Sequence, residues 1–426
     1  MKYHTKKLPG FLVVMMFLVP VCLRAQDTIH ITLPEAEKQF LQNNLSLLAE
    51  RYNIDMARAQ VIQARLYNNP TLILNGNLYN PQRNKILDVS NKTGQYDIGL
   101  QQLIRLAGKR NKEIKLAETS VSLSENQFFD LVRTLRYSLR SEFYNLFYLQ
   151  QSVNTYEQQI RSLEIMSAAY NELQAKGVVP LKDAVRIRSL LYSLQTELAG
   201  MVNQLNESES NLQLLLQNNK TYFIADSNTT AMQASSYRQL NVLSLIDTAY
   251  ANRYDLKAAE TNLLLSKQNY SLQKALAKTD LTLGAEFDKR GSFVDNASFL
   301  TVTIDLPFFK RNQGNIRAAR WSIKQSEAGV ELAKQTVENE VRKDYVRLLN
   351  SEKMLRSIDP DFQLQFEKLM QGVTDNFRKK NISLIEFIDF QESYRNNTVQ
   401  FNQLQNEMQQ AAEALNFAVG KTILNN

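Results

Sequence analysis

Cysteine and histidine are almost absent from this chain of 426 residues. Its single cysteine is Cys22, and its two histidines are His4 and His30. With so few of these residues, the chain has no plausible candidates for a Ser/His/Asp or Cys/His catalytic site. Disulfides and thiolate metal sites are excluded for the chain beyond Cys22. We therefore expect that the protein is not an enzyme, and that it has no cofactor and no metal site.

A large excess of positive charge is also missing once the N-terminus is set aside. The formal net charge is +7, but residues 1–25 carry four basic residues and no acidic one. The remaining chain has 46 basic and 43 acidic residues, a net charge of +3. Such a balance gives no basic surface for nucleic acid, so we expect no nucleic-acid partner.

Residues 1–25 have the pattern of a secretory signal peptide. A lysine-bearing head precedes an apolar run from Phe11 to Leu23, and a cleavage site follows Ala25. The alternative is a retained anchor, but the run is shorter than the ~20 residues that a spanning helix needs. Pro20 and Val21 disfavour lipidation of Cys22.

Glycine and proline are scarce, with 13 and 8 residues, and neither occurs in residues 109–176, 182–199 or 373–419. These runs predict long helices, one of them from about Lys109 to Leu173 and roughly 100 Å long. Apolar residues in the runs recur every three or four positions, which predicts coiled-coil packing. The first such series is Ile187, Leu191, Leu194, Leu198, Met201, Leu205, Ser208, Leu212 and Leu215, and the second is Phe401, Leu404, Met408, Ala411, Leu415 and Ala418.

Four short segments, residues 71–79, 96–103, 281–288 and 300–306, have a different period. In the last, Leu300, Val302 and Ile304 alternate with polar residues. Strict alternation predicts strands with one apolar and one polar face. Behind a signal peptide, such strands suit an outer-membrane barrel, whereas the alternative is a hairpin packed on a soluble core.

The order of these elements repeats along the chain. We divide it into a signal peptide (1–25), a first repeat (26–217), an equatorial segment (218–240) and a second repeat (241–426). Two turns, KGVVPLKDAV at 176–185 and KKNISLIEFID at 379–389, occupy equivalent places. Gly177 and Val178 match Asn381 and Ile382 in this alignment.

Four strands cannot close a barrel, and an open edge is not tolerated in lipid. Closure therefore requires two or three chains, with eight or twelve strands. The helices would continue the barrel as a tube, and the two turns would form its distal mouth.

Several stretches carry a family resemblance. These are the junctions QQLIRLAGKRNKEIKLAE (101–118) and LPFFKRNQGNIRAA (306–319), the break IDPDF (358–362) and the turn LQAKGVVPLKDAV (173–185). Over nearly the whole mature length, the chain resembles the TolC-like outer-membrane efflux proteins. The first junction is similar to that of the CzcC-like heavy-metal branch.

The resemblance implies a mainly α protein with a small transmembrane β part. Its form would be a homotrimer with a twelve-stranded barrel in the outer membrane of a Gram-negative bacterium. A long periplasmic coiled-coil barrel would dock onto a periplasmic adaptor protein. The adaptor would couple it to an inner-membrane transporter of the resistance-nodulation-division type. The chain itself would be a passive exit duct for small molecules or metal cations.

The resemblance also implies site residues. Glu386 and Asp389 would form an acidic ring at the pore constriction, with Asp183 as the counterpart in the first repeat. The alternative is two solvated carboxylates paired with Lys379 or Lys380. The adaptor contact would involve Gly177, Val178, Val179, Pro180, Asn381, Ile382 and Ser383, or these residues pack only locally. Asn381 replaces the glycine of relatives and tolerates left-handed geometry.

Two other functions stay open at this point. The outer component of a type I protein secretion system would have the same barrel and turns. A secreted structural coiled coil explains the heptads, but not the alternating segments.

Overall fold

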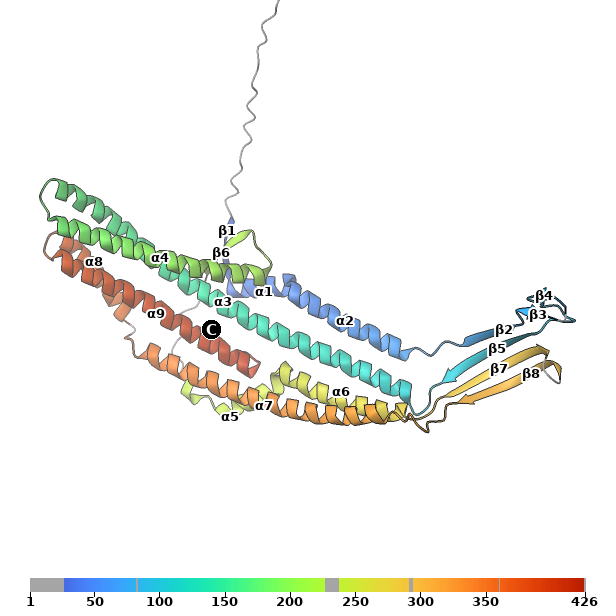
Figure 1. Cartoon of the computed structure of the whole chain (residues 1–426). Coiled ribbons are helices and arrows are strands. Elements are labelled where there is room, and N and C mark those ends of the chain that lie inside the picture. The colour runs from blue at the N-terminus through green and yellow to red at the C-terminus, as the bar shows by residue number, and fades with distance from the viewer. Residues whose placement is uncertain (1–26, 82, 227–236, 291–293, 360, 425–426) are drawn as a thin grey trace, which may run out of the picture.

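The computed structural model describes residues 27–81, 83–226, 237–290, 294–359 and 361–424. The predicted signal peptide and Cys22 lie outside this range. The molecule is elongated, with long helices along most of its length and a small sheet at one end (Figure 1). The helices are α1 (Leu33–Asn43), α2 (Leu45–Arg65), α3 (Lys109–Ala175), α4 (Leu181–Leu216), α5 (Val242–Asn252), α6 (Tyr254–Leu276), α7 (Gln313–Arg356), α8 (Phe362–Arg378) and α9 (Leu384–Val419), with a short 3-10 helix at Tyr237–Gln239. The strands are β1 (Asp27–Thr32), β2 (Thr71–Gly76), β3 (Tyr79–Asn80), β4 (Lys85–Ile86), β5 (Tyr96–Ile104), β6 (Thr221–Asp226), β7 (Leu281–Arg290) and β8 (Asp295–Ile304).

Helix α3 is a single rod of 67 residues. Gly108, with φ of +67°, is its N-cap and lies four residues after the end of strand β5, and Ala175 ends it at the far end of the molecule. At ~1.5 Å per residue its length is about 100 Å. The predicted long helix is therefore confirmed, and one helix links the sheet to the distal turn.

The predicted apolar seams are the contacts between the helices. Ile187, Leu194 and Leu212 of α4 are at most 2% exposed. Leu194 clusters with Tyr156, Ile160 and Leu163 of α3, and Leu212 clusters with Leu139 and Phe143 of the same helix. Leu415 and Ala418 of α9 are fully buried against the α5–α7 side. The heptads thus predicted the buried apolar seams correctly, although Gln159, Asn402 and Gln409 are buried as well.

The second long helix is interrupted. Helix α7 ends at Arg356 and α8 begins at Phe362, which confirms the break expected at 358–362. Ser357 N donates to the carbonyl oxygens of Lys353 and Met354, which closes the last turn of α7. Asp361 N donates to Asp359 Oδ1 at 3.0 Å, so a side chain organises the connection. The first repeat has no such interruption in α3.

The four predicted strands form one antiparallel sheet in the order β2-β5-β7-β8. Its register places Leu72, Leu100, Ala285 and Leu300 side by side on one face. The next row places Thr71, Gln101, Gly284 and Thr301 on the other face. One face is therefore mainly apolar and the other mainly polar, as the alternation predicted. The last strand begins at Asp295, five residues before the predicted start.

Strands β1 and β6 form a parallel pair that the sequence did not predict. Asp27 pairs with Thr221 and Thr32 with Asp226. Ile31, Phe223 and other residues of the pair are buried against α1, α3 and α4. Strand β6 belongs to the predicted equatorial segment 218–240, of which residues 227–236 lie outside the described part.

Two arginines hold helices together near the middle of the molecule. Arg140 on α3 donates to Glu37 on α1 at 2.5 Å and to Glu413 on α9 at 3.1 Å. Arg253, 2% exposed, contacts Glu340 on α7 at 2.5 Å and the carbonyl oxygen of Ala418 at 3.1 Å. The Arg140–Glu413 contact thus links α3 of the first repeat to α9 of the second, whereas the Arg253 contacts link α7 and α9 within the second repeat.

Candidate functional site

The two predicted turns lie together at the end of the molecule opposite the sheet (Figure 1). One joins α3 to α4, and the other joins α8 to α9. The structure therefore brings together both groups of predicted site residues. Their placement supports a common role for the two turns, which we call the tip.

The first turn ends α3 with a glycine in the left-handed conformation. Gly177 has φ of +72°, and its N–H donates to the carbonyl oxygen of Gln174 at 2.9 Å. Val178 N–H donates to the carbonyl oxygen of Leu173 at 2.9 Å. This pair of bonds is the Schellman motif, which satisfies the last carbonyls of a helix. Pro180 then precedes the first residue of α4.

The second turn uses the same motif, but its left-handed residue is Lys380 and not Asn381. Lys380 has φ of +60°, and its N–H donates to the carbonyl oxygen of Phe377 at 2.9 Å. Asn381 N–H donates to the carbonyl oxygen of Asn376 at 2.9 Å. Lys380 is thus the equivalent of Gly177, and the predicted match of Gly177 with Asn381 is wrong by one residue. The helix end sets the position, because α8 must present these carbonyls to the next two N–H groups.

Glu386 forms a capping box at the start of α9. Its Oε2 accepts from Ser383 N at 2.8 Å, and Ser383 Oγ accepts from Glu386 N at 3.2 Å. The hydrogen bonds from the Ser383 backbone and side chain lower the pKa of Glu386. The carboxylate therefore remains ionised and is held at the helix N-terminus, where negative charge is favourable.

The other two predicted acidic residues differ in environment. Asp389 lies one turn after Glu386 and is exposed, whereas Asp183 is half-buried in the first turn of α4. Burial raises the pKa of Tyr170, and the nearby Asp183 carboxylate adds to that effect. In the part of the chain that the structure describes, neither Glu386 nor Asp389 forms an ion pair with Lys379 or Lys380. The ion pairs that were the alternative to an acidic ring are therefore not present between these residues.

An aromatic stack that the sequence did not predict holds the second turn. The rings of Phe377 and Phe387 are stacked with centroids 4.4 Å apart, and Phe387 is fully buried. Tyr170 of α3 stacks on Phe377 at 6.3 Å, which connects the two turns. Ile382 is half-buried and packs against the same cluster. Phe377 before the turn and Phe387 after it could have indicated this stack from the sequence.

Exposed apolar residues surround the tip. Val178 is 61% exposed, while Val179 is half-buried. Leu181, Val185 and Ile385, which were not predicted as site residues, are also exposed. These three residues lie off the heptad seam, and this position in the sequence could have indicated that they are exposed. The tip thus presents apolar side chains beside carboxylates, a surface suited to contact with another protein.

The sheet at the other end has an apolar face that no other described part of the chain covers. Leu72, Leu74, Leu100, Leu300 and Val302 are each more than half exposed. Strands β2 and β8 each have one neighbour in the four-stranded sheet, so among the described residues nothing pairs with either of its edges. Within the described residues, no helix is long and apolar enough to cross a membrane. The same part of the chain contains no group of three or more His, Cys, Asp or Glu that could hold a metal ion.

Comparisons with known proteins match both halves of the chain. The family described as Outer membrane efflux protein matches residues 37–218 and 245–421. Outer membrane protein TolC of Escherichia coli (strain K12) is 31% identical over 196 residues, which cover 41% of this chain and 38% of TolC. Cobalt-zinc-cadmium resistance protein CzcC of Cupriavidus metallidurans is 23% identical over 292 residues, which cover 68% of this chain and 66% of CzcC. The chain therefore spans less than two thirds of each relative.

The fold is that of a solved outer membrane channel. The crystal structure of CmeC from Campylobacter jejuni matches with a TM-score of 0.73 and 14% identity, covering 92% of this chain and 87% of CmeC. At that identity the match shows the fold alone. The mainly helical architecture with a four-stranded sheet is therefore confirmed.

Proposed function

This chain belongs to the outer membrane efflux protein family, and from that premise we propose that it is the outer-membrane channel of a tripartite efflux system. In this role it is a passive exit duct for small molecules or metal cations. The observation that carries the proposal is the two-faced sheet with two free edges, joined directly to helices about 100 Å long. A soluble hairpin would instead bury its apolar face.

Closing the sheet into a barrel requires more than one copy of the chain. The free edges of β2 and β8 carry unpaired backbone groups, which lipid does not tolerate. Pairing β2 of one copy with β8 of the next satisfies them. We take three copies, with twelve strands, as in the homotrimer that the family resemblance implies. The apolar face then contacts lipid, and the polar face lines the lumen.

The tip supports an adaptor contact. It lies a full helix length from the sheet, so a chain anchored in the outer membrane places it deep in the periplasm (Figure 1). Gly177, Val178, Val179 and Pro180 in the first turn and Asn381, Ile382 and Ser383 in the second would meet the periplasmic adaptor protein. An inner-membrane transporter of the resistance-nodulation-division type would deliver the cargo.

The acidic residues of the tip support a constriction. Glu386 and Asp389 are three residues apart on α9, so their side chains lie on one side of the helix. The capping box fixes Glu386 as a carboxylate. In a trimer these residues form rings of like charge that attract cations and disfavour anions, with Asp183 beside them. The name of the relative CzcC, a cobalt-zinc-cadmium resistance protein, favours metal cations as cargo.

The test is single-channel conductance of the purified oligomer in a planar bilayer. Wild type is compared with Glu386→Gln/Asp389→Asn and with the control Asp375→Asn, an exposed acid on α8. We expect a small cation-selective conductance that loses selectivity in the double variant alone. If the double variant left the selectivity unchanged, the assignment of Glu386 and Asp389 to the constriction would be wrong, but the proposal of a channel would stand. A protein that forms no heat-sensitive trimer and no conductance would refute the function.

A further inference from the structure

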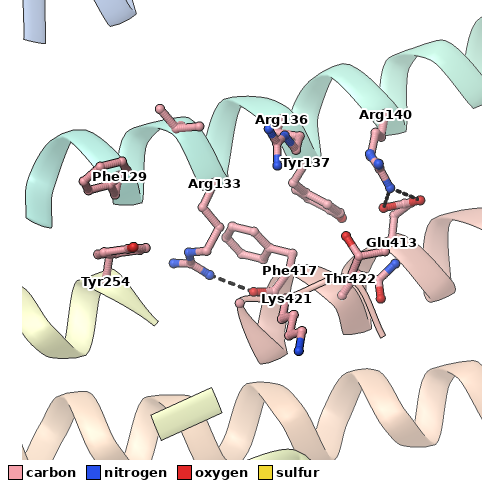
Figure 2. Close-up of a pocket in the computed structure, with 13 residues that line it drawn as sticks. Phe129, Arg133, Arg136, Tyr137, Arg140, Tyr254, Glu413, Phe417, Lys421 and Thr422 are labelled. Atoms are coloured by element: carbon pink, nitrogen blue, oxygen red, sulfur yellow. Dashed lines mark hydrogen bonds and ion pairs between the residues drawn. The ribbon is translucent and has the colours of Figure 1, made fainter. Parts of the chain in front are cut away.

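A cavity of about 320 Å³ lies between α3, the end of α9 and the start of α6 (Figure 2). It is far from both the tip and the sheet. Ligand sites in proteins begin at about 300 Å³, so the cavity has room for a small organic molecule. Neither the conduit nor the tip requires it.

Aromatic rings form much of its wall. Phe129 and Tyr254 are stacked with centroids 4.9 Å apart, and Tyr137 and Phe417 are stacked at 4.8 Å. Each pair joins α3 to an element of the second half of the chain. The cavity therefore offers flat apolar surfaces, which suit a planar ligand.

The charged groups around the cavity are mainly basic. Arg133, Arg136 and Arg140 project from α3, and Lys421 lies on the opposite side (Figure 2). Glu413 is the one carboxylate in the lining. Four cationic side chains thus share one lining carboxylate.

Two of these cations are engaged by neighbours. Arg140 contacts Glu413 at 3.1 Å, as well as Glu37. Arg133 contacts Asp130 at 2.7 Å and lies 3.6 Å from Asp255, and it also donates to the carbonyl oxygen of Phe417 at 2.8 Å. Both guanidinium groups therefore have their charge balanced inside the protein.

The other two cations are not balanced. Among the described residues, Arg136 forms no hydrogen bond or ion pair, and its Nε is buried without a partner. Lys421 is exposed at the rim, again with no ion pair to a described residue. A buried guanidinium N–H without an acceptor costs free energy, which an anionic ligand would recover.

We propose that this cavity binds a small planar carboxylate, whose anionic group is held by Arg136 and whose ring packs on the aromatic walls, with Lys421 adding positive charge from the opposite side. The ligand would touch α3, α6 and the end of α9, so binding would also tie the two halves of the chain. The proposal is independent of the cargo of the channel.

The test uses the full mature protein purified in detergent and isothermal titration calorimetry. The probes are 2-naphthoate and the uncharged 2-naphthylmethanol, which share the ring system. The variants are Arg136→Gln and Lys421→Gln, and the control is Arg161→Gln, an exposed arginine on the same helix outside the cavity.

We expect one naphthoate per chain with a dissociation constant below about 1 mM, and at least about tenfold weaker binding of the alcohol. Arg136→Gln should weaken naphthoate binding by at least about tenfold, Lys421→Gln should weaken it less, and Arg161→Gln should not change it. Equal binding of the two probes, or unchanged binding in Arg136→Gln, would overturn the proposal. Absence of naphthoate binding would also overturn the proposal. If, in addition, Arg136→Gln destabilised the trimer, the cavity would be assigned to the contact between copies.

Discussion

Replacing Arg140 with methionine would remove the cation that α3 places against Glu413 of α9. The Glu413 side chain is 3% exposed, and Arg140 Nη1 lies 3.1 and 3.2 Å from its two carboxylate oxygens. Methionine fills much of the arginine stem but carries no charge. The variant therefore leaves Glu413 in a site without its ionic partner.

The cost of this substitution follows from burial. Removing one partner of a buried ion pair typically costs 3–5 kcal/mol, and the 20% exposure of the Arg140 side chain points to about 3 kcal/mol. Neutralising the remaining acid with Glu413→Gln should recover about 2 kcal/mol in the double variant, since the uncompensated charge is gone. Arg161→Met, which breaks an exposed pair, should change stability by less than about 0.5 kcal/mol.

The defect should also depend on pH. Burial raises the pKa of Glu413, while Arg140 opposes that shift. Without Arg140 the pKa of Glu413 rises further, so the folded state binds a proton more tightly than the unfolded state does. Stability then increases as the pH falls through the folded pKa towards the unfolded value of 4.5. The deficit of Arg140→Met is largest at neutral pH and shrinks on acidification.

The assay is urea unfolding of the detergent-solubilised protein, followed by far-ultraviolet circular dichroism at pH 7.5 and pH 5. Wild type, both single variants, the double variant and the control Arg161→Met are compared. A loss below about 1 kcal/mol in Arg140→Met, or a double variant no more stable than Arg140→Met, would refute the reasoning.

Two further predictions concern the tip and the sheet. Lys380→Gly should stabilise the protein by about 1 kcal/mol in the same assay, because glycine adopts the left-handed conformation without steric cost. Asn381→Gly should bring no such gain, and the opposite order would contradict the position of the turn. Leu300→Arg, in the middle of the apolar face, should cost about 2–4 kcal/mol if that face meets lipid. It should therefore reduce the heat-sensitive trimer in outer-membrane fractions, whereas Thr301→Arg on the polar face should not. Equal effects of the two would contradict the orientation of the sheet.

Local patterns predicted the helices, the four strands and the family. The spacing of Ile187, Leu194 and Leu212 marked the buried seam, since only one stripe of a helix can face its partner. The alternation from Leu300 to Ile304 marked a strand with two unlike faces. The start of β8 at Asp295 was missed, because residues 295–298 are polar or small and show no alternation. The TolC-like resemblance is confirmed by the family match over both halves of the chain.

Features that depend on distant contacts could not be predicted. Strand β1 pairs with β6 across nearly 200 residues, and neither strand carries a signal for its partner. Asn381 has the better intrinsic tendency towards left-handed geometry, yet the carbonyls at the end of α8 place Lys380 there. Asp183, Glu386 and Asp389 were chosen by alignment with the family. Their role in a constriction depends on neighbouring copies and stays a prediction.

The break between α7 and α8 gives the two halves of the molecule different mechanics. An unbroken rod such as α3 transmits a push at one end to the other, since bending it would strain hydrogen bonds along its length. Between Arg356 and Phe362 the second half has a joint instead, where α8 can tilt without bending α7. We therefore expect the α8 side of the tip to deform more readily than the α3 side, which has no such interruption.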